Sequence, residues 1–140
     1  YRPRRISIYD INLATAIALV GRLKSNFKYT EFRVARSVKE LGIQNSDLLI
    51  NATPLGMKEE DPCIVNQDYL HRNLLVYDLI YNPAQTKLLR LARDKGCSVC
   101  NGLGMLLYQG ALSFEIWTGK KAPLEIMRQA LTKNIQTNDY

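Results

Sequence analysis

The stretch DLLINATPLGM, residues 47–57, joins a run of apolar residues to a turn made of small residues, a proline and a glycine. The apolar run has the length of a strand that is covered on both faces, as strands of a parallel sheet are. Residues 51–53 leave room above the backbone where the strand ends, and Pro54 and Gly56 shape the turn. The stretch therefore predicts a buried strand whose carboxyl end has space for a flat ligand, although a tight loop without a ligand also explains the turn.

Strands and helices are expected to alternate on both sides of this stretch. The apolar spacing predicts five strands, in residues 4–10, 31–38, 47–53, 73–81 and 97–102. Asn12 is expected to cap the first helix, and Gly96 and Gly119 to end two later ones. The helices are predicted in residues 11–27, 38–42, 86–95, 104–119 and 123–133, and the helix at 86–95 is expected to turn Leu88, Leu89 and Ala92 inward. Such alternation is typical of an α/β fold with a parallel sheet and crossover helices.

The composition restricts the class of protein. The chain has 140 residues, 46% of them hydrophobic, which suits one globular domain or a piece of one. No apolar run reaches the roughly 20 residues that cross a membrane, so no membrane partner is expected. The first 40 residues carry nine Lys or Arg and three acids, but the basic residues are scattered and lack aromatic stacking platforms. We therefore expect a solvated basic face with a minor role toward an anionic cofactor, and no nucleic-acid partner.

Three cysteines are present, Cys63, Cys97 and Cys100. Cys97 and Cys100 form a C-x-x-C pair, a spacing found in redox pairs and in halves of zinc sites. A zinc site would need two more ligands, and the favoured interpretation is that the two thiols pack as small apolar groups. We therefore expect no metal, and a reducing cytoplasm as the location.

Asp10 is a candidate cofactor residue, because it follows the first predicted strand and precedes a helix. In a dinucleotide-binding fold a carboxylate there accepts hydrogen bonds from the adenine ribose and repels a 2′-phosphate. An ordinary loop aspartate is the alternative. The G-x-G-x-x-G turn that usually accompanies such a site is absent. If residues 4–10 are a second strand, the first strand and its Gly-rich turn are expected upstream of Tyr1.

Three motifs occur in a distinctive order: NATPLGM at 51–57, YDLIYNPAQTKLL at 77–89 and NGLGMLLYQGALSFEIWTG at 101–119. Over about residues 6–130 the chain resembles the shikimate dehydrogenase family, including its quinate/shikimate relatives. The resemblance implies reversible NAD(P)-dependent reduction of 3-dehydroshikimate to shikimate, in the chorismate route to aromatic amino acids. The implied fold is Rossmann-like, a three-layer parallel sheet with C-terminal helices.

The resemblance also implies a domain plan. Residues 1–103 would form a partial NAD(P)-binding domain. Residues 104–135 would form C-terminal helices that pack on it and face the substrate cleft, and residues 136–140 a frayed tail. The family's catalytic Lys and Asp lie in an N-terminal substrate domain that is not in this sequence. No catalytic residue is therefore assigned here, neither Lys87 nor Asp78, and the isolated chain is expected to be inactive.

The remaining site residues are carried over from the family by position. Tyr81 and Gln109 would bind the substrate, shikimate or 3-dehydroshikimate. The cofactor-binding residues would be Asp10, Ile11, Asn12, Ala52, Thr53, Pro54, Leu79, Gly102 and Met105.

The chain departs from the family after the first predicted strand. Many NADP-using members have Asn-Arg-Thr where this chain has Asp10, Ile11 and Asn12. No arginine there can pair with a 2′-phosphate, so NAD is favoured over NADP. The alternatives are a quinate/shikimate dehydrogenase of quinate catabolism and a non-catalytic nucleotide-binding module. A homodimer is compatible with the resemblance, but the sequence does not specify one.

Overall fold

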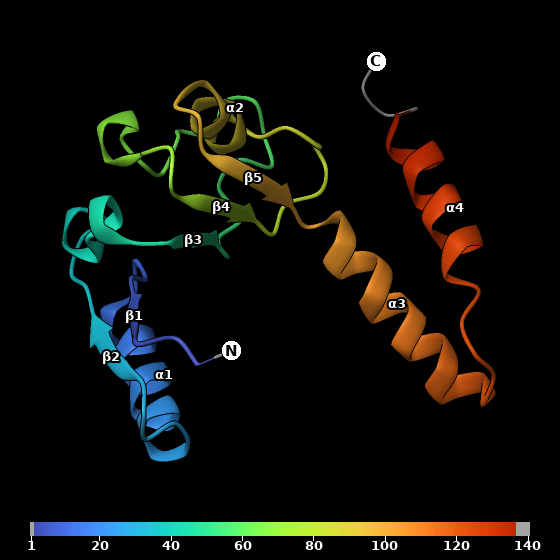
Figure 1. Ribbon diagram of the computed structural model, residues 1–140, viewed down its shortest axis with the longest axis horizontal. Helices are drawn as coiled ribbons and strands as arrows, with labels where there is room; N and C mark the ends of the chain where they lie inside the picture. Colours follow the sequence, from blue (N-terminus) through green and yellow to red (C-terminus); the bar gives the residue numbers. More distant parts are fainter. Residues whose placement is uncertain (1, 137–140) are drawn as a thin grey trace. The chain divides into compact units, whose positions relative to one another are not determined.

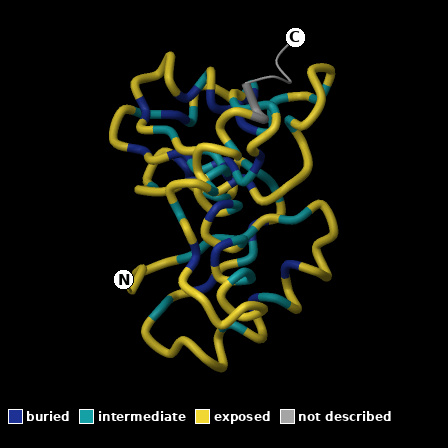
Figure 2. The backbone as a smooth tube through the Cα atoms, turned by 90° about the vertical axis from the view of Figure 1, so that its right-hand side faces the viewer, coloured by how far each residue is buried: buried dark blue, intermediate teal, exposed yellow. Residues whose placement is uncertain are grey.

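The computed structural model describes the backbone of residues 2–136 and the side chains of residues 2–133. The chain divides into two compact units, Tyr1–Ser46 and Asp47–Tyr140, which are described separately. Along much of the chain, buried residues occur singly or in short runs between exposed ones (Figure 2). The predicted boundary between residues 103 and 104 is a different division, and it remains a prediction.

The first unit is a strand–helix–strand element. Strands β1 (Arg5–Ile8) and β2 (Glu31–Val34) are parallel, and helix α1 (Leu13–Asn26) connects them and packs on β2. Asn12 caps α1 as predicted, because its side chain accepts a hydrogen bond from the backbone N–H of Ala14 at 3.1 Å. The buried apolar residues of this unit are Ala16, Val20, Phe32, Ala35 and Ile43.

Two short 3₁₀ helices end the first unit. They are η1 (Lys39–Leu41) and η2 (Ile43–Asn45), and Gly42 lies between them with a φ of 71°. The predicted turn of helix at residues 38–42 is therefore present, and the second 3₁₀ helix is an addition to it. The strand predicted at 31–38 is shorter, since pairing with β1 stops at Val34.

The second unit contains a three-stranded parallel sheet. Strand β4 (Leu75–Asp78) lies between β3 (Leu48–Asn51) and β5 (Ser98–Asn101). Helix α2 (Lys87–Asp94) packs on β4 and β5 and buries its predicted inner face, Leu88, Leu89 and Ala92. The connection from β3 to β4 contains only one 3₁₀ turn, η3 (Gln67–Tyr69), and no α-helix.

Two helices complete the second unit. Helix α3 (Leu103–Thr118) leads away from the end of β5, and α4 (Leu124–Gln136) returns beside it (Figure 1). Gly119, with a φ of 66°, ends α3 as predicted. Much of α3 is apolar and exposed, in particular Met105, Tyr108, Leu112, Ile116 and Trp117.

The α/β class with parallel strands is confirmed, and the strands form two separate sheets, β1–β2 and β3–β4–β5. The packing predicted for the C-x-x-C pair is only half right. Cys97 is buried, whereas Cys100 lies on an exposed position of the edge strand β5. Of the predicted frayed tail, Gln136 belongs to α4, and residues 137–140 lie outside the described part of the chain.

Candidate functional site

The three strands of the second unit end in register. Asn51, Asp78 and Asn101 are paired partners, each the last residue of its strand. Because the strands are parallel, the residues that follow them leave the sheet at one edge. The predicted cofactor residues at positions 52–54, 79 and 102 therefore begin side by side at the carboxyl ends of the strands.

A buried carboxylate joins the ends of β3 and β4. Asp78 is fully buried, and its Oδ1 atom accepts hydrogen bonds from Asn51 Nδ2 at 3.0 Å and from the N–H of Ile80 at 3.1 Å. Its Oδ2 atom accepts a 2.6 Å hydrogen bond from the hydroxyl of Thr86, the cap of α2. Buried polar groups are costly unless paired, and these are paired. The cluster thus fixes the strand ends against the start of α2.

Asn51 organises the turn after β3. Its Oδ1 atom accepts hydrogen bonds from the N–H of Thr53 at 3.0 Å and from the hydroxyl of Thr53 at 2.7 Å. Its Nδ2 atom also donates to the carbonyl of Leu55 at 3.2 Å. From the sequence alone, residue 51 was expected only to be a small residue at the strand end. The sequence did contain a signal for its role, because Asn51 and Asp78 are polar residues that each end an apolar strand.

Gly102 and Leu79 lie against each other. A Cβ atom at Gly102 would overlap the carbonyl group of Leu79, and the Gly102 N–H donates to the carbonyl of Ile80 at 3.1 Å. The next helix, α3, begins immediately afterwards. These two predicted cofactor residues are therefore in direct contact, and the backbone atoms of Leu79 leave no room for a side chain at residue 102.

The other predicted residues of this unit lie on exposed surface. Ala52, Thr53 and Pro54 are exposed, and Tyr81 is 38% exposed three residues after the buried Asp78. Met105 and Gln109 are exposed on α3, where a spacing of four residues places them on one face. This edge of the unit thus presents small, apolar and amide groups.

Asp10, Ile11 and Asn12 belong to the first unit. Asp10 is partly exposed, and its Oδ1 atom accepts a 2.8 Å hydrogen bond from the N–H of Asn12. Ile11 is 96% exposed. The carboxylate of Asp10 therefore closes the turn that opens α1, at the carboxyl end of β1.

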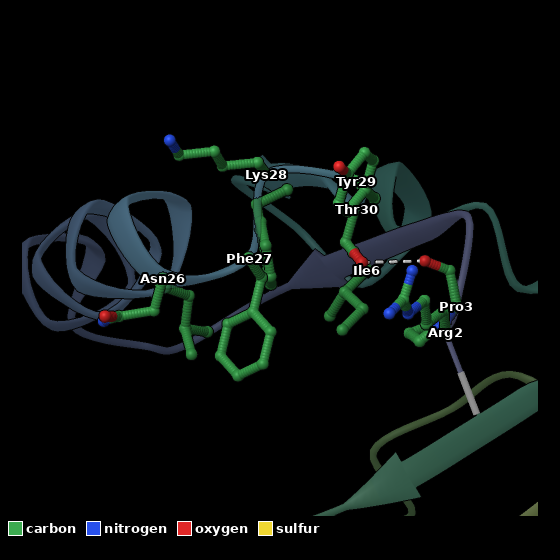
Figure 3. A pocket seen from close by; sticks show the side chains of 10 residues that line it. Arg2, Pro3, Ile6, Asn26, Phe27, Lys28, Tyr29 and Thr30 are labelled. Atoms are coloured by element: carbon green, nitrogen blue, oxygen red, sulfur yellow. Dashed lines mark hydrogen bonds between the residues drawn. The ribbon is translucent and has the colours of Figure 1, made fainter.

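The first unit also carries a groove at the opposite ends of its strands (Figure 3). Its volume is about 650 Å³. The Thr30 hydroxyl donates to the carbonyl of Pro3 at 2.9 Å, and the Arg2 guanidinium lies 5.5 Å from the centre of the Tyr29 ring. Arg2 and Pro3 precede β1, and Tyr29 and Thr30 precede β2, whereas the Asp10 turn follows β1. The groove is therefore separate from that turn. Its lining is Arg2, Pro3, Ile6, Leu23, Asn26, Phe27, Lys28, Tyr29, Thr30 and Phe32.

The cysteines show no ligand geometry. Burial raises the pKa of the Cys97 thiol, which donates to the carbonyl of His71 at 3.2 Å. Among the described residues, no group of three or more His, Cys, Asp or Glu side chains is placed to hold a metal ion. In the same part of the chain, none of the helices has both the length and the apolarity to cross a bilayer.

Parallel strands, with helical crossovers from β1 to β2 and from β4 to β5 and with turns gathered at the carboxyl strand ends, define a Rossmann-like α/β protein. The model of the shikimate 5′-dehydrogenase C-terminal domain matches residues 102–132. The shikimate dehydrogenase (NADP(+)) of Methanobrevibacter smithii is 39% identical over 95% of this chain and 48% of its own length. The chain therefore belongs to the shikimate dehydrogenase family.

Solved structures agree with this assignment. Listeria monocytogenes shikimate 5-dehydrogenase, in complex with shikimate and NAD, matches 91% of this chain and 47% of its own, with a TM-score of 0.80 and 35% identity. Corynebacterium glutamicum quinate dehydrogenase, in complex with NAD, matches 93% and 46%, with a TM-score of 0.82 and 26% identity. The chain spans between about one third and one half of the length of the curated relatives it matches.

Proposed function

We propose that the chain is the cofactor-binding part of a shikimate dehydrogenase, which reversibly reduces 3-dehydroshikimate to shikimate with NAD or NADP. The observation that carries the proposal is the similarity to enzymes of that name over nearly the whole chain. In this plan residues 1–103 hold the cofactor, and residues 104–135 face the substrate cleft. A cytoplasmic location and a homodimer belong to the same proposal.

The turns at the carboxyl strand ends suit the nicotinamide half of a dinucleotide. The nicotinamide carries the hydride when it is bound, and the protein aligns it. Ala52 and Thr53 present small exposed side chains, and Gly102 presents none. Asn51 fixes the position of Thr53 through two hydrogen bonds, so this part of the surface is ordered before any ligand arrives. Leu79, Pro54 and Met105 complete the proposed surface.

Tyr81 and Gln109 are proposed substrate ligands. Both are exposed, and each carries groups that donate and accept hydrogen bonds. A polyhydroxylated acid in a closed cleft needs such partners, because unpaired polar groups there are costly. In this role Tyr81 and Gln109 bind hydroxyl or carboxylate groups and leave proton transfer to other residues.

The acid–base pair is proposed to come from an N-terminal substrate domain. Asp78 is buried and accepts three hydrogen bonds, and Lys87 donates to the carbonyl of Asp61 at 2.9 Å, so both have structural contacts. The exposed apolar side chains of α3 support a further domain, because large exposed apolar patches mark interaction surfaces.

A reconstruction tests this proposal. The 140-residue chain alone is compared with a completed enzyme, in which the chain follows the N-terminal half of the Methanobrevibacter smithii relative. Shikimate-dependent reduction of NAD+ and NADP+ is expected only from the completed enzyme. Substantial turnover by the chain alone would refute the placement of the catalytic pair. A folded completed enzyme that binds NAD(P) without turnover would favour the non-catalytic binding module.

Cofactor preference has its own test. Asp10 is expected to favour NAD, since its carboxylate repels a 2′-phosphate and no neighbouring Arg compensates. In the completed enzyme, Asp10→Asn should shift the ratio of kcat/KM values for NAD+ and NADP+ toward NADP+. An unchanged ratio would contradict the role of Asp10, and would leave its hydrogen bond to Asn12 as a structural contact.

A quinate-oxidising enzyme is the second candidate, favoured by the fold match to quinate dehydrogenase. The completed enzyme is assayed with quinate and shikimate at equal concentrations. A higher kcat/KM for quinate would favour this candidate over the first.

A further inference from the structure

The turn after β3 is closed from its far end by Asp61. The Oδ2 atom of Asp61 accepts hydrogen bonds from the N–H groups of Gly56 at 2.9 Å and of Lys58 at 3.0 Å. Gly56 has a φ of +109°, a conformation that side-chain-bearing residues rarely adopt. Since Asn51 orders the first half of the turn through Thr53, side chains hold the segment at both ends.

The closed turn is also attached to α2. The ammonium group of Lys87, the first residue of that helix, donates to the main-chain carbonyl of Asp61 at 2.9 Å. At Gly56 the turn packs against Ile80, in the loop after β4, and against Thr86, the cap of α2. A Cβ atom added at Gly56 would lie 3.4 Å from the side chain of Ile80 and 3.5 Å from that of Thr86. Thr86 in turn binds the buried carboxylate of Asp78. The turn, the loop after β4 and the start of α2 are thus one connected structure.

We propose that Asp61 is a positioning residue for the cofactor-facing turn. Its carboxylate closes the turn and Lys87 attaches it to α2, so that residues 52–54 are presented in one arrangement at the strand ends. Asp61 acts through the turn and touches none of the reacting atoms. The identity of the molecule that the turn binds rests on the proposed function, whereas the closure of the turn by Asp61 does not.

The ionised form of Asp61 is the one that closes the turn. The N–H groups of Lys58 and Gly56, and the charges of Lys58 and Lys87, hold the pKa of Asp61 below its ordinary value. The carboxylate therefore accepts both hydrogen bonds at neutral pH and into the mildly acidic range. They weaken as the pH falls through that lowered pKa.

The first experiment follows the amide protons of Gly56 and Lys58 by NMR in the 140-residue chain as the pH is lowered. Both resonances should shift with one common midpoint below the ordinary pKa of an aspartate. Asp61→Asn should abolish that titration while leaving the chain folded, since the amide oxygen still accepts both hydrogen bonds. Different midpoints for the two amides, or a titration that persists in Asp61→Asn, would overturn the proposal.

The second experiment measures KM for the cofactor and kcat in the completed enzyme. Asp61→Ala should raise KM roughly tenfold with little change in kcat, about the effect of one lost hydrogen bond to a charged group. Asp61→Asn should recover most of the loss. The matched control is Glu59→Gln, which removes the same charge from an exposed position of the same turn and should leave both constants unchanged.

The two experiments separate the proposals. A completed enzyme without activity toward shikimate or quinate contradicts the proposed function, and the NMR titration still decides whether Asp61 closes the turn. An active enzyme in which Asp61→Ala lowers kcat and thermal stability but leaves KM unchanged would reduce Asp61 to a structural residue. An equal loss in Glu59→Gln would assign the effect to charge instead of hydrogen bonding.

Discussion

The carbonyl group of Leu79 occupies the space that a side chain at residue 102 would need. Gly102 itself has a φ of −73°, so its backbone conformation is open to any residue. Glycine is required there by contact and not by conformation. At Gly56, by contrast, the φ of +109° makes the backbone conformation itself the constraint.

Replacing Gly102 with alanine should destabilise the chain. The new methyl group would overlap backbone atoms, which cannot rotate away, and overpacking of this kind costs about 1–3 kcal/mol. Urea unfolding followed by circular dichroism gives the change in free energy. Gly104→Ala is the control, because the added Cβ would meet no atom within 4 Å apart from its chain neighbours and the backbone of its own helix, and alanine favours the helix by up to about 1 kcal/mol. Equal stability of Gly102→Ala and the original chain would contradict the contact.

Replacing Thr86 with valine should be more harmful than replacing it with serine. Valine keeps the shape but removes the hydroxyl that binds Asp78 and accepts from the N–H of Leu89. Leaving a buried carboxylate oxygen and a helix end unpaired should cost about 2–4 kcal/mol. Serine keeps the hydroxyl and loses a methyl group, for about 1 kcal/mol. If urea unfolding shows that Thr86→Ser is less stable than Thr86→Val, the hydroxyl of Thr86 does not stabilise the chain in this way.

At the scale of elements, the sequence predicted features that depend on neighbouring residues better than features that depend on contacts between distant residues. The caps Asn12 and Gly119 and the buried face of α2 were predicted correctly, because each depends on residues within one or two turns. The roles of Asn51 and Asp61 were missed. Each depends on where a loop returns in space, and no spacing in the sequence records that.

The pairing of β1 with β2 includes an ion pair that should respond to pH. Arg5 Nε lies 2.8 Å from Glu31 Oε2, with both side chains about half exposed, and this contact lowers the pKa of Glu31. A lowered folded-state pKa means that the stabilisation is present above the ordinary value and is lost as the pH falls through the lowered one.

Glu31→Gln should therefore lower the melting temperature slightly at neutral pH and have no effect once the pH is below the folded-state pKa of Glu31. Thermal unfolding of both proteins across this range measures the difference. The difference should also shrink at high salt, because exposed charges are screened. A difference that grows on acidification would contradict the ion pair.

At the scale of the whole molecule, the two compact units differ in their means of support. In the second unit β4 is paired on both sides and its Val76 is fully buried, whereas the first unit has a single pair of strands. A two-stranded sheet is marginal by itself, so the first unit depends on the packing of α1 on β2.

Hydrogen exchange followed by mass spectrometry should show this difference. Peptides that contain β4 are expected to exchange more slowly than peptides that contain β2, because local opening costs less where fewer buried contacts are broken. Uniform protection across residues 5–101 would indicate that the two units open together. An excess of protection in the first unit would contradict the prediction.

The candidate site was predicted in part. The motifs predicted which turns meet at the carboxyl strand ends, and the register of β3, β4 and β5 brings those of the second unit to one edge. The turn at Asp10 belongs to the other unit, so its role remains a prediction. The polar cluster beneath these turns could not be predicted from the sequence. Asp78 contacts Asn51, which lies 27 positions away along the chain, and Thr86, which lies 8 positions away.

That cluster should restrict which substitutions its three positions tolerate. Asp78 is hydrogen-bonded to both Asn51 and Thr86, and all three side chains are buried away from water. A single substitution that removes the polar group of one of them therefore leaves another without a hydrogen-bond partner. In an alignment of relatives the three positions should therefore mutate as a set, with apolar triplets tolerated and mixed ones rare. Selection would then act on the three residues together, independently of the substrate of each relative.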